Sequence, residues 1–196
     1  MKELREEVKG KRESNYDINP IFLNRWSPRA LERDMDEEDL MALFEAARWA
    51  PSSYNNQHWR FLYATPEDSE WQTFVDLMGD FNKSWAKEGF ALVVIISKTT
   101  FDHNGEEART HSFDTGSAWE NLALEAASRD LVAHGMQGFD YHKAREELDV
   151  PEGFEVEAMV AVGSKGDESK LDEDVQIEPN GRKDMDEIVS KGSFDF

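Results

Sequence analysis

Two short polar segments contain the residues best suited to chemistry. The first is Arg25-Trp26-Ser27-Pro28-Arg29, in which two guanidinium groups flank a hydroxyl. Ser27 followed by Pro28 is typical of the N-cap and first position of a helix. Arginines beside a helix N-terminus can bind phosphate, because free N–H groups, the helix dipole and bidentate guanidinium groups act together. Taken alone, the segment also fits an ordinary capped helix with surface arginines.

The second polar segment is the loop at residues 51–57, PSSYNNQ, which follows a stretch rich in alanine. Its hydroxyl and amide groups can hydrogen-bond a flat heterocycle that carries several donors and acceptors. Taken alone, this segment also fits a hydrophilic surface loop.

Several common catalytic motifs are missing from the sequence. It has no GxGxxG, GxxxxGK[ST], GxSxG or HExxH pattern, and it has no cysteine. These absences exclude the usual dinucleotide fingerprint, the P-loop, the common serine-hydrolase elbow and thiolate chemistry. The five histidines show no metal-ligand spacing, so we interpret them as surface or core residues. We assign neither a metal site nor a catalytic side chain.

The elements that must position these segments follow from hydrophobic periodicity. Asp36, with Asp39 three residues later, predicts the start of a helix that Pro51 ends. The apolar run at 91–97 predicts a central strand buried on both faces, and residues 99–113 predict a polar loop or lid. Further strands are expected at 59–64, 131–135 and 154–162, further helices at 67–78, 114–129 and 142–148, and a turn at 179–181.

These elements predict one α+β domain of few strands and several helices. We divide the chain into an arm at 1–19, mobile or loosely helical, and a domain at 20–196. The net charge of −20 argues against nucleic-acid and anionic-membrane partners, since phosphates would be repelled. No apolar run suits a transmembrane helix or a signal peptide. With zero cysteines, we expect a cytoplasmic protein.

Several segments in order resemble the nitroreductase family of flavoproteins over about residues 20–190. The arginine segment is followed by ARWAPSSYNNQHW, then ALVVIISKT and DTGSAWENLALEAASRD. HGMQGFD, REELDVP, AMVAVG and the basic element Asn180-Gly181-Arg182-Lys183 come after them. The resemblance implies a sandwich with a central, mostly antiparallel sheet flanked by helices. It also implies an intertwined homodimer with FMN bound at its interface.

Site residues carry over position by position. Arg25, Ser27, Arg29 and Arg182 match positions that bind the FMN phosphate, and Asn82 matches a contact to the polar edge of the flavin. Two positions depart from the family: Trp85 stands where a lysine is common, and Gln137 stands where glutamate is common. Lys83 and Lys87 are candidates to replace that lysine. The remaining matches are a loop contributed by the other subunit, Pro51, Ser52, Ser53 and Asn55, and the stretch near flavin N5, Met136, Gln137 and Gly138.

The resemblance implies that NAD(P)H gives hydride to flavin N5, after which a nitroaromatic, quinone or related acceptor is reduced at the same site in ping-pong fashion. Three alternatives stay open. One is another flavin chemistry on this scaffold, such as reductive dehalogenation, flavin fragmentation or azoline oxidation. Another is a non-catalytic protein that binds FMN, senses redox state or presents its acidic surface to a basic partner. The third is a scaffold that has lost its flavin.

Overall fold

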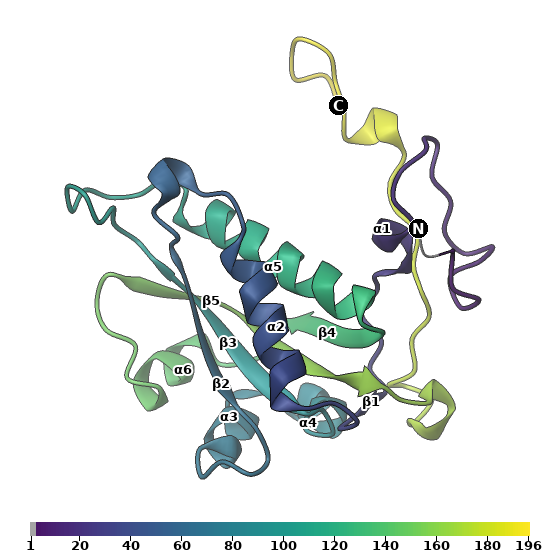
Figure 1. The fold of residues 1–196 in the computed structure, drawn as a ribbon, viewed down its shortest axis with the longest axis horizontal. Coiled ribbons are helices and arrows are strands. Elements are labelled where there is room, and N and C mark those ends of the chain that lie inside the picture. The colour runs from purple at the N-terminus through teal and green to yellow at the C-terminus, as the bar shows by residue number, and fades with distance from the viewer. Residues whose placement is uncertain (1–2) are drawn as a thin grey trace.

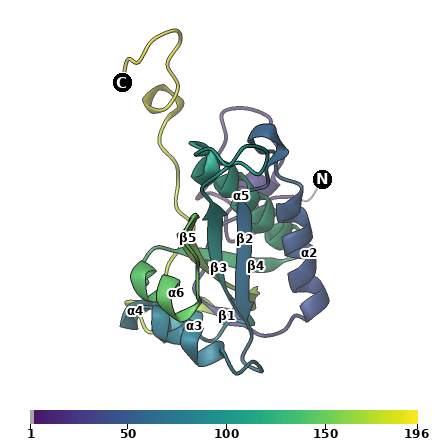
Figure 2. The same cartoon turned by 90° about the vertical axis from the view of Figure 1, so that its left-hand side faces the viewer.

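A five-stranded antiparallel sheet lies between two layers of helices in the computed structural model, which describes residues 3–196 (Figures 1 and 2). The strand order is β1-β5-β3-β2, and β4 also pairs with β5. Every pairing is antiparallel. The predicted α+β architecture is therefore confirmed. The strands are β1 Leu31–Glu32, β2 Trp59–Ala64, β3 Ala91–Lys98, β4 Leu131–Met136 and β5 Phe154–Lys165.

Six α-helices and three short 3₁₀ helices accompany these strands in residues 3–196. Two of the helices, α2 and α5, cover one face of the sheet, while α3, α4 and α6 lie on the other side (Figure 2). None of the described helices is both long and apolar enough to cross a membrane. The α-helices are α1 Ile21–Asn24, α2 Glu37–Arg48, α3 Trp71–Leu77, α4 Asp80–Ala86, α5 His111–Ser128 and α6 Tyr141–Glu147; the 3₁₀ helices are η1 Ser53–Asn55, η2 Glu168–Lys170 and η3 Met185–Glu187.

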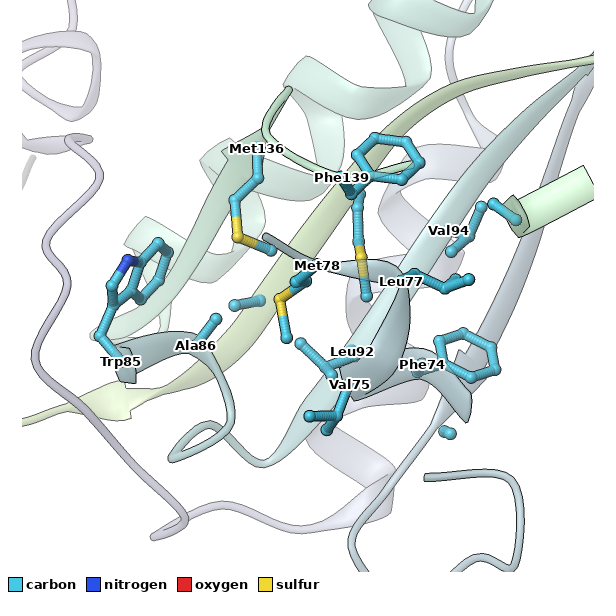
Figure 3. Packing of buried hydrophobic residues seen from close by; sticks show 14 of the residues in the cluster. Phe74, Val75, Leu77, Met78, Trp85, Ala86, Leu92, Val94, Met136 and Phe139 are labelled. Atoms are coloured by element: carbon cyan, nitrogen blue, oxygen red, sulfur yellow. The ribbon is translucent and has the colours of Figure 1, made fainter. Parts of the chain in front are cut away.

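The central strand β3 explains why its sequence is an unbroken apolar run. Successive side chains of a strand point to opposite faces, and both faces of this sheet are covered. Leu92, Val94 and Ile96 pack with the layer of α3, α4 and α6, where Trp85, Leu77 and Phe74 also lie (Figure 3). The alternate residues Ala91, Val93 and Ile95 pack under α2 and α5.

Helices α2 and α5 pack closely because small side chains line their contact. Ala47 of α2 and Ala118 and Ala126 of α5 are fully buried in the same cluster. The predicted N-cap of α2 is present: the Asp36 carboxylate accepts a hydrogen bond from the Asp39 N–H at 2.9 Å. The helix ends at Arg48, three residues before Pro51. The α2–α5 layer is thus built from features that the sequence shows locally.

The structure corrects four local expectations. No helix begins at Ser27 and Pro28; the short α1 ends before them, and the chain runs irregularly to β1. Helix α3 begins at Trp71 rather than near residue 67, and α4 was not anticipated. The turn expected at 179–181 does not form. Residues 176–184 have neither regular secondary structure nor a turn, and they lead away from the sheet (Figure 1).

Residues 3–19 of the N-terminal arm contact the rest of the chain and contain turns but no helix, where we expected a mobile or loosely helical arm. Val8 is fully buried, and Arg12 is 7% exposed. The Asn24 side chain hydrogen-bonds the backbone of Glu3 and Arg5 at 2.9 Å each. Residues 1 and 2 lie outside the described residues. The division into an arm at 1–19 and a domain at 20–196 stays a prediction.

Candidate functional site

Four arginines from distant parts of the chain line one hollow of about 530 Å³. Arg25 and Arg29 lie between α1 and β1, Arg182 comes from the C-terminal segment, and Arg12 comes from the arm. Ser27 lines the same hollow. The structure therefore brings together all four residues that the sequence assigned to phosphate, and it adds Arg12.

The backbone from Pro28 to Ala30 is shaped by tertiary hydrogen bonds and not by a helix. One carboxylate oxygen of Glu168 accepts from the N–H groups of Arg29 and Ala30, at 2.9 and 3.1 Å. The Pro28 carbonyl accepts from Nδ1 of His134 at 2.9 Å. These partners use the groups that a helix would pair within itself. An anion in this hollow would be held by guanidinium groups, without a helix dipole.

The positive charge of the hollow is not neutralised by ion pairs. Among the ion pairs of residues 3–196, none joins a carboxylate to Arg12, Arg25, Arg29 or Arg182. The one acidic residue in the lining, Glu178, pairs with Lys11 at 2.9 Å. Four guanidinium groups without carboxylate partners are unexpected in a chain of net charge −20, and they favour an anionic ligand.

Burial and the nearby positive charges lower the pKa values of two of these arginines, Arg12 and Arg25. Burial, together with the charges of Arg182 and Arg25, lowers the pKa of Arg12 to about 10. Burial also lowers the pKa of Arg25; Glu120 opposes this effect and Arg182 adds to it. A bound phosphate would relieve the repulsion, because each cation would gain a nearby negative charge.

Arg12 ties the arm to both other segments of the hollow. Its Nε donates to the Asn180 carbonyl at 2.8 Å, and Nη2 donates to the Asn180 side-chain oxygen at 3.1 Å. Its Nη1 donates to the carbonyls of Leu23 and Arg25, at 2.9 and 2.6 Å. Sequence analysis missed this residue because its partners lie up to 168 positions away. The only signal in the sequence was an arginine in a charged arm, which also contains Arg5.

A second hollow, of about 980 Å³, lies between the end of β4 and α4. Asn82 of α4 and the stretch Met136, Gln137 and Gly138 line it, as the resemblance implied. The Gly138 carbonyl accepts from the Asn82 side chain at 3.0 Å and from the Gly79 N–H at 3.2 Å. Helix α4 is thus fixed to the strand end through backbone and amide groups.

The two hollows meet at Arg29 and His134, the two residues that line both of them. The Arg29 guanidinium lies 4.7 Å from the ring centre of Phe81 and donates from Nη1 to the Val175 carbonyl at 2.9 Å. Its buried Nε has no hydrogen-bond partner among the described residues. A ligand with a phosphate at one end and a ring at the other could therefore span both hollows past Arg29.

Trp85 does not enter either hollow. It is 1% exposed and lies in the buried cluster near Ala86 (Figure 3). Its ring packs against the His134 ring, with centroids 4.5 Å apart. Neither proposed substitute for the missing lysine lines the hollows; Lys83 pairs with Asp76 at 3.1 Å. The lysine that does line the larger hollow is Lys143 of α6.

The loop with Pro51, Ser52, Ser53 and Asn55 lines neither hollow in the same chain. The Ser53 N–H donates to Asp114, near the start of α5, at 2.9 Å. Arg25 lies beside Ala127, near the end of that helix. The thirteen residue steps from Asp114 to Ala127 span about 20 Å along the helix axis at 1.5 Å per residue. One chain therefore does not bring this loop to the arginines.

The same loop is strained and tightly anchored. Tyr54, Asn55 and Gln57 have φ values of 53°, 53° and 52°, which side chains other than glycine rarely adopt. Asn56 bridges to the following loop: its amide donates to the Thr100 carbonyl at 3.2 Å and accepts from the Asp102 N–H at 2.8 Å. Such strain is commonly found where a ligand or partner is bound.

Gly138→Ala is expected to destabilise the strand end. A Cβ there would lie 2.7 Å from the Asn82 side-chain nitrogen, so Asn82 must move and lose its hydrogen bond. Overpacking of this kind lowers the free energy of unfolding by about 1 kcal/mol, measurable by urea unfolding. Gly116→Ala is the control, since its Cβ would meet nothing within 4 Å and helix propensity favours alanine. Equal stability changes in the two variants would contradict the contact.

Several known proteins are similar to this chain in sequence and fold. The family model described as "Nitroreductase family" matches residues 23–164. A solved structure described as an oxidoreductase containing FMN is 41% identical with a TM-score of 0.90, over 94% of this chain and 96% of that one. An uncharacterised 15.4 kDa protein of Mycolicibacterium smegmatis is 32% identical over 66% of this chain and 90% of its own. The candidate NAD(P)H nitroreductase MhqN of Bacillus subtilis is 25% identical over 78% and 87%.

The chain belongs to the nitroreductase family, because the family model matches residues 23–164, which are most of its length. The antiparallel sheet between helix layers is the fold that this membership implies.

Proposed function

We propose that this protein is an FMN-dependent oxidoreductase that takes hydride from NAD(P)H and reduces nitroaromatic, quinone or related acceptors. The observation that carries the proposal is the junction of two hollows at Arg29: one is lined by four arginines without carboxylate partners, and the other by amide and backbone groups. The 41% identical relative containing FMN and the similarity to MhqN support the choice of cofactor and reductant.

The residues fit the two ends of FMN. Phosphate needs donors and positive charge, which Arg12, Arg25, Arg29 and Arg182 supply. Arg29 lines both hollows, so its guanidinium group can contact a ligand in either of them. The flavin ring needs a partly apolar cradle with a few polar groups. Met136 and Gly138 offer apolar surface and close backbone approach, while Asn82 and Gln137 offer amide groups.

Bound FMN would supply the redox chemistry by accepting hydride from NAD(P)H and passing electrons to the acceptor. The protein residues bind the cofactor, orient its ring and tune its reduction potential. The arginines fix the phosphate, and Asn82 and Gln137 present hydrogen bonds at the ring. Because reductant and acceptor use the same space in turn, the kinetics should be ping-pong. No side chain is assigned as a nucleophile or an obligatory acid.

We further propose that the protein works as an intertwined homodimer. The loop of Pro51, Ser52, Ser53 and Asn55 would then approach the flavin of the other subunit, since it lines neither hollow of its own chain. The C-terminal segment leaves the body with exposed apolar side chains suited to a second subunit (Figure 1). They are Met185, Ile188, Val189, Phe194 and Phe196. Because the chain has no cysteine, we place it in the reducing cytoplasm.

A two-step reaction under anaerobic conditions tests the function. We expect NADPH or NADH to bleach the bound flavin, and a nitroaromatic or quinone added afterwards to restore its colour. Parallel lines in double-reciprocal plots would support ping-pong turnover. If neither reduced nicotinamide bleaches a bound flavin, the oxidoreductase proposal is wrong, and the non-catalytic flavin-binding alternative, motivated by Trp85 and Gln137, replaces it.

A further inference from the structure

His134 occupies the narrow place where the two hollows meet. It lies on β4 and lines both hollows, a position shared only with Arg29 among the described residues. A ligand that reaches from the arginines to Gly138 must therefore pass these two side chains. Arg29 can only donate hydrogen bonds. Any hydrogen-bond acceptor at the junction must therefore come from His134.

The His134 ring is held in one orientation. Its Nδ1 lies 2.9 Å from the Pro28 carbonyl oxygen. Since a carbonyl can only accept, Nδ1 must carry the proton of this bond. The ring also packs against the buried Trp85, at 4.5 Å between centroids. A flip of the ring by 180° would break the Pro28 bond, and the packing against Trp85 holds the ring plane, so the position of Nε2 is fixed as well.

The Nε2 atom is a free acceptor. No described residue hydrogen-bonds to it, and it is not among the fully buried atoms that lack partners, so it is open to the hollow. Burial lowers the pKa of His134, the charges of Arg29 and Arg25 lower it further, and the Pro28 bond and Glu168 oppose them. The neutral ring carries its proton on Nδ1, which leaves a lone pair on Nε2.

We propose that His134 binds the hydroxylated linker between the phosphate and the ring of FMN. The phosphate dianion has no donor for this atom, because its oxygens only accept, whereas the linker hydroxyls donate to Nε2 and accept from Arg29. This inference rests on the proposed function. It gives a role to a histidine that the sequence left as a surface or core residue.

Two substitutions test the roles of the two ring nitrogens separately: His134→Asn and His134→Gln. Asparagine has an N–H about as far from the backbone as Nδ1, so it can keep the Pro28 bond, but nothing replaces Nε2. Glutamine carries an amide oxygen to the place of Nε2. Three ligands separate the parts of the cofactor: FMN, riboflavin without the phosphate, and lumiflavin without linker or phosphate. Fluorescence titration of the full-length chain, freed of bound flavin, gives each dissociation constant.

We expect His134→Asn to weaken FMN and riboflavin alike, by about 3- to 10-fold, the value of one neutral hydrogen bond. Lumiflavin should bind as it does to the wild type, and His134→Gln should retain affinity for all three ligands. Thermal unfolding checks that both variants fold. Unchanged riboflavin affinity in His134→Asn would overturn the inference, and so would an equal loss for lumiflavin.

The outcomes also distinguish this inference from the proposed function. If the wild-type chain binds no flavin, both are wrong. If the wild type binds FMN in an Arg29-dependent manner and His134→Asn leaves the FMN and riboflavin affinities unchanged, the proposed function is retained and the proposed role of His134 is wrong.

Discussion

Arg29→Ala is expected to weaken FMN binding by about one to two decades. A hydrogen bond to a charged group contributes about 1.5–3 kcal/mol, and each 1.4 kcal/mol is tenfold in affinity. The largest loss is expected at Arg29, because it is the only one of the four arginines that lines both hollows. Fluorescence titration with FMN and riboflavin measures the effect, and riboflavin affinity should fall less.

Arg33→Ala is the matched control for this prediction. Arg33 is an exposed arginine four positions away that donates to the Lys87 carbonyl at 2.9 Å and lines neither hollow. Its removal changes the net charge equally but should leave FMN affinity unaltered. If FMN binds equally well to wild type, Arg25→Ala and Arg29→Ala, the hollow is not the phosphate site.

Arg12→Ala is expected to lower the free energy of unfolding by about 1.5–3 kcal/mol and to weaken FMN binding as well. The side chain is buried and makes four hydrogen bonds that connect the arm, Arg25 and Asn180. Without it, Asn180 and the nearby Arg182 lose their anchor. Arg12→Lys should not restore either property, since an ammonium lacks the planar fork that reaches both partners. Urea unfolding and FMN titration measure the two effects.

The control for Arg12 is Lys9→Ala in the same arm. Lys9 forms a surface ion pair with Glu6, and such pairs contribute at most about 1 kcal/mol. A variant of Arg12 that matched Lys9→Ala in both stability and FMN affinity would show that the arm has no part in the site.

The fold was largely predictable where patterns are local. The apolar run of β3, the alternation in β5 and the N-cap of α2 depend on neighbours a few residues away, and each lies where it was predicted. The helix expected at Ser27 does not form, because distant residues hydrogen-bond to the backbone groups that a helix would pair. Glu168 takes the N–H groups of Arg29 and Ala30, and His134 takes the Pro28 carbonyl.

The candidate site was predictable only in part, for the same reason. Arg25, Arg29 and Arg182 were found through the family resemblance, which marks their positions without stating their contacts. Arg12 and His134 have no local signature, because an arginine in a charged arm and a histidine in a strand are common in any protein. Their significance lies in partners 168 and 106 residues away, which no single-sequence pattern contains.

The most direct test of the central claim is the visible absorption spectrum of the purified full-length protein, recorded before and after addition of FMN. We expect a flavin spectrum from about one bound FMN per chain, either as purified or after addition, and its loss or weakening in Arg29→Ala. A colourless protein that takes up no added FMN would contradict the account, because the arginine hollow and the hollow at Gly138 would then have no flavin to hold.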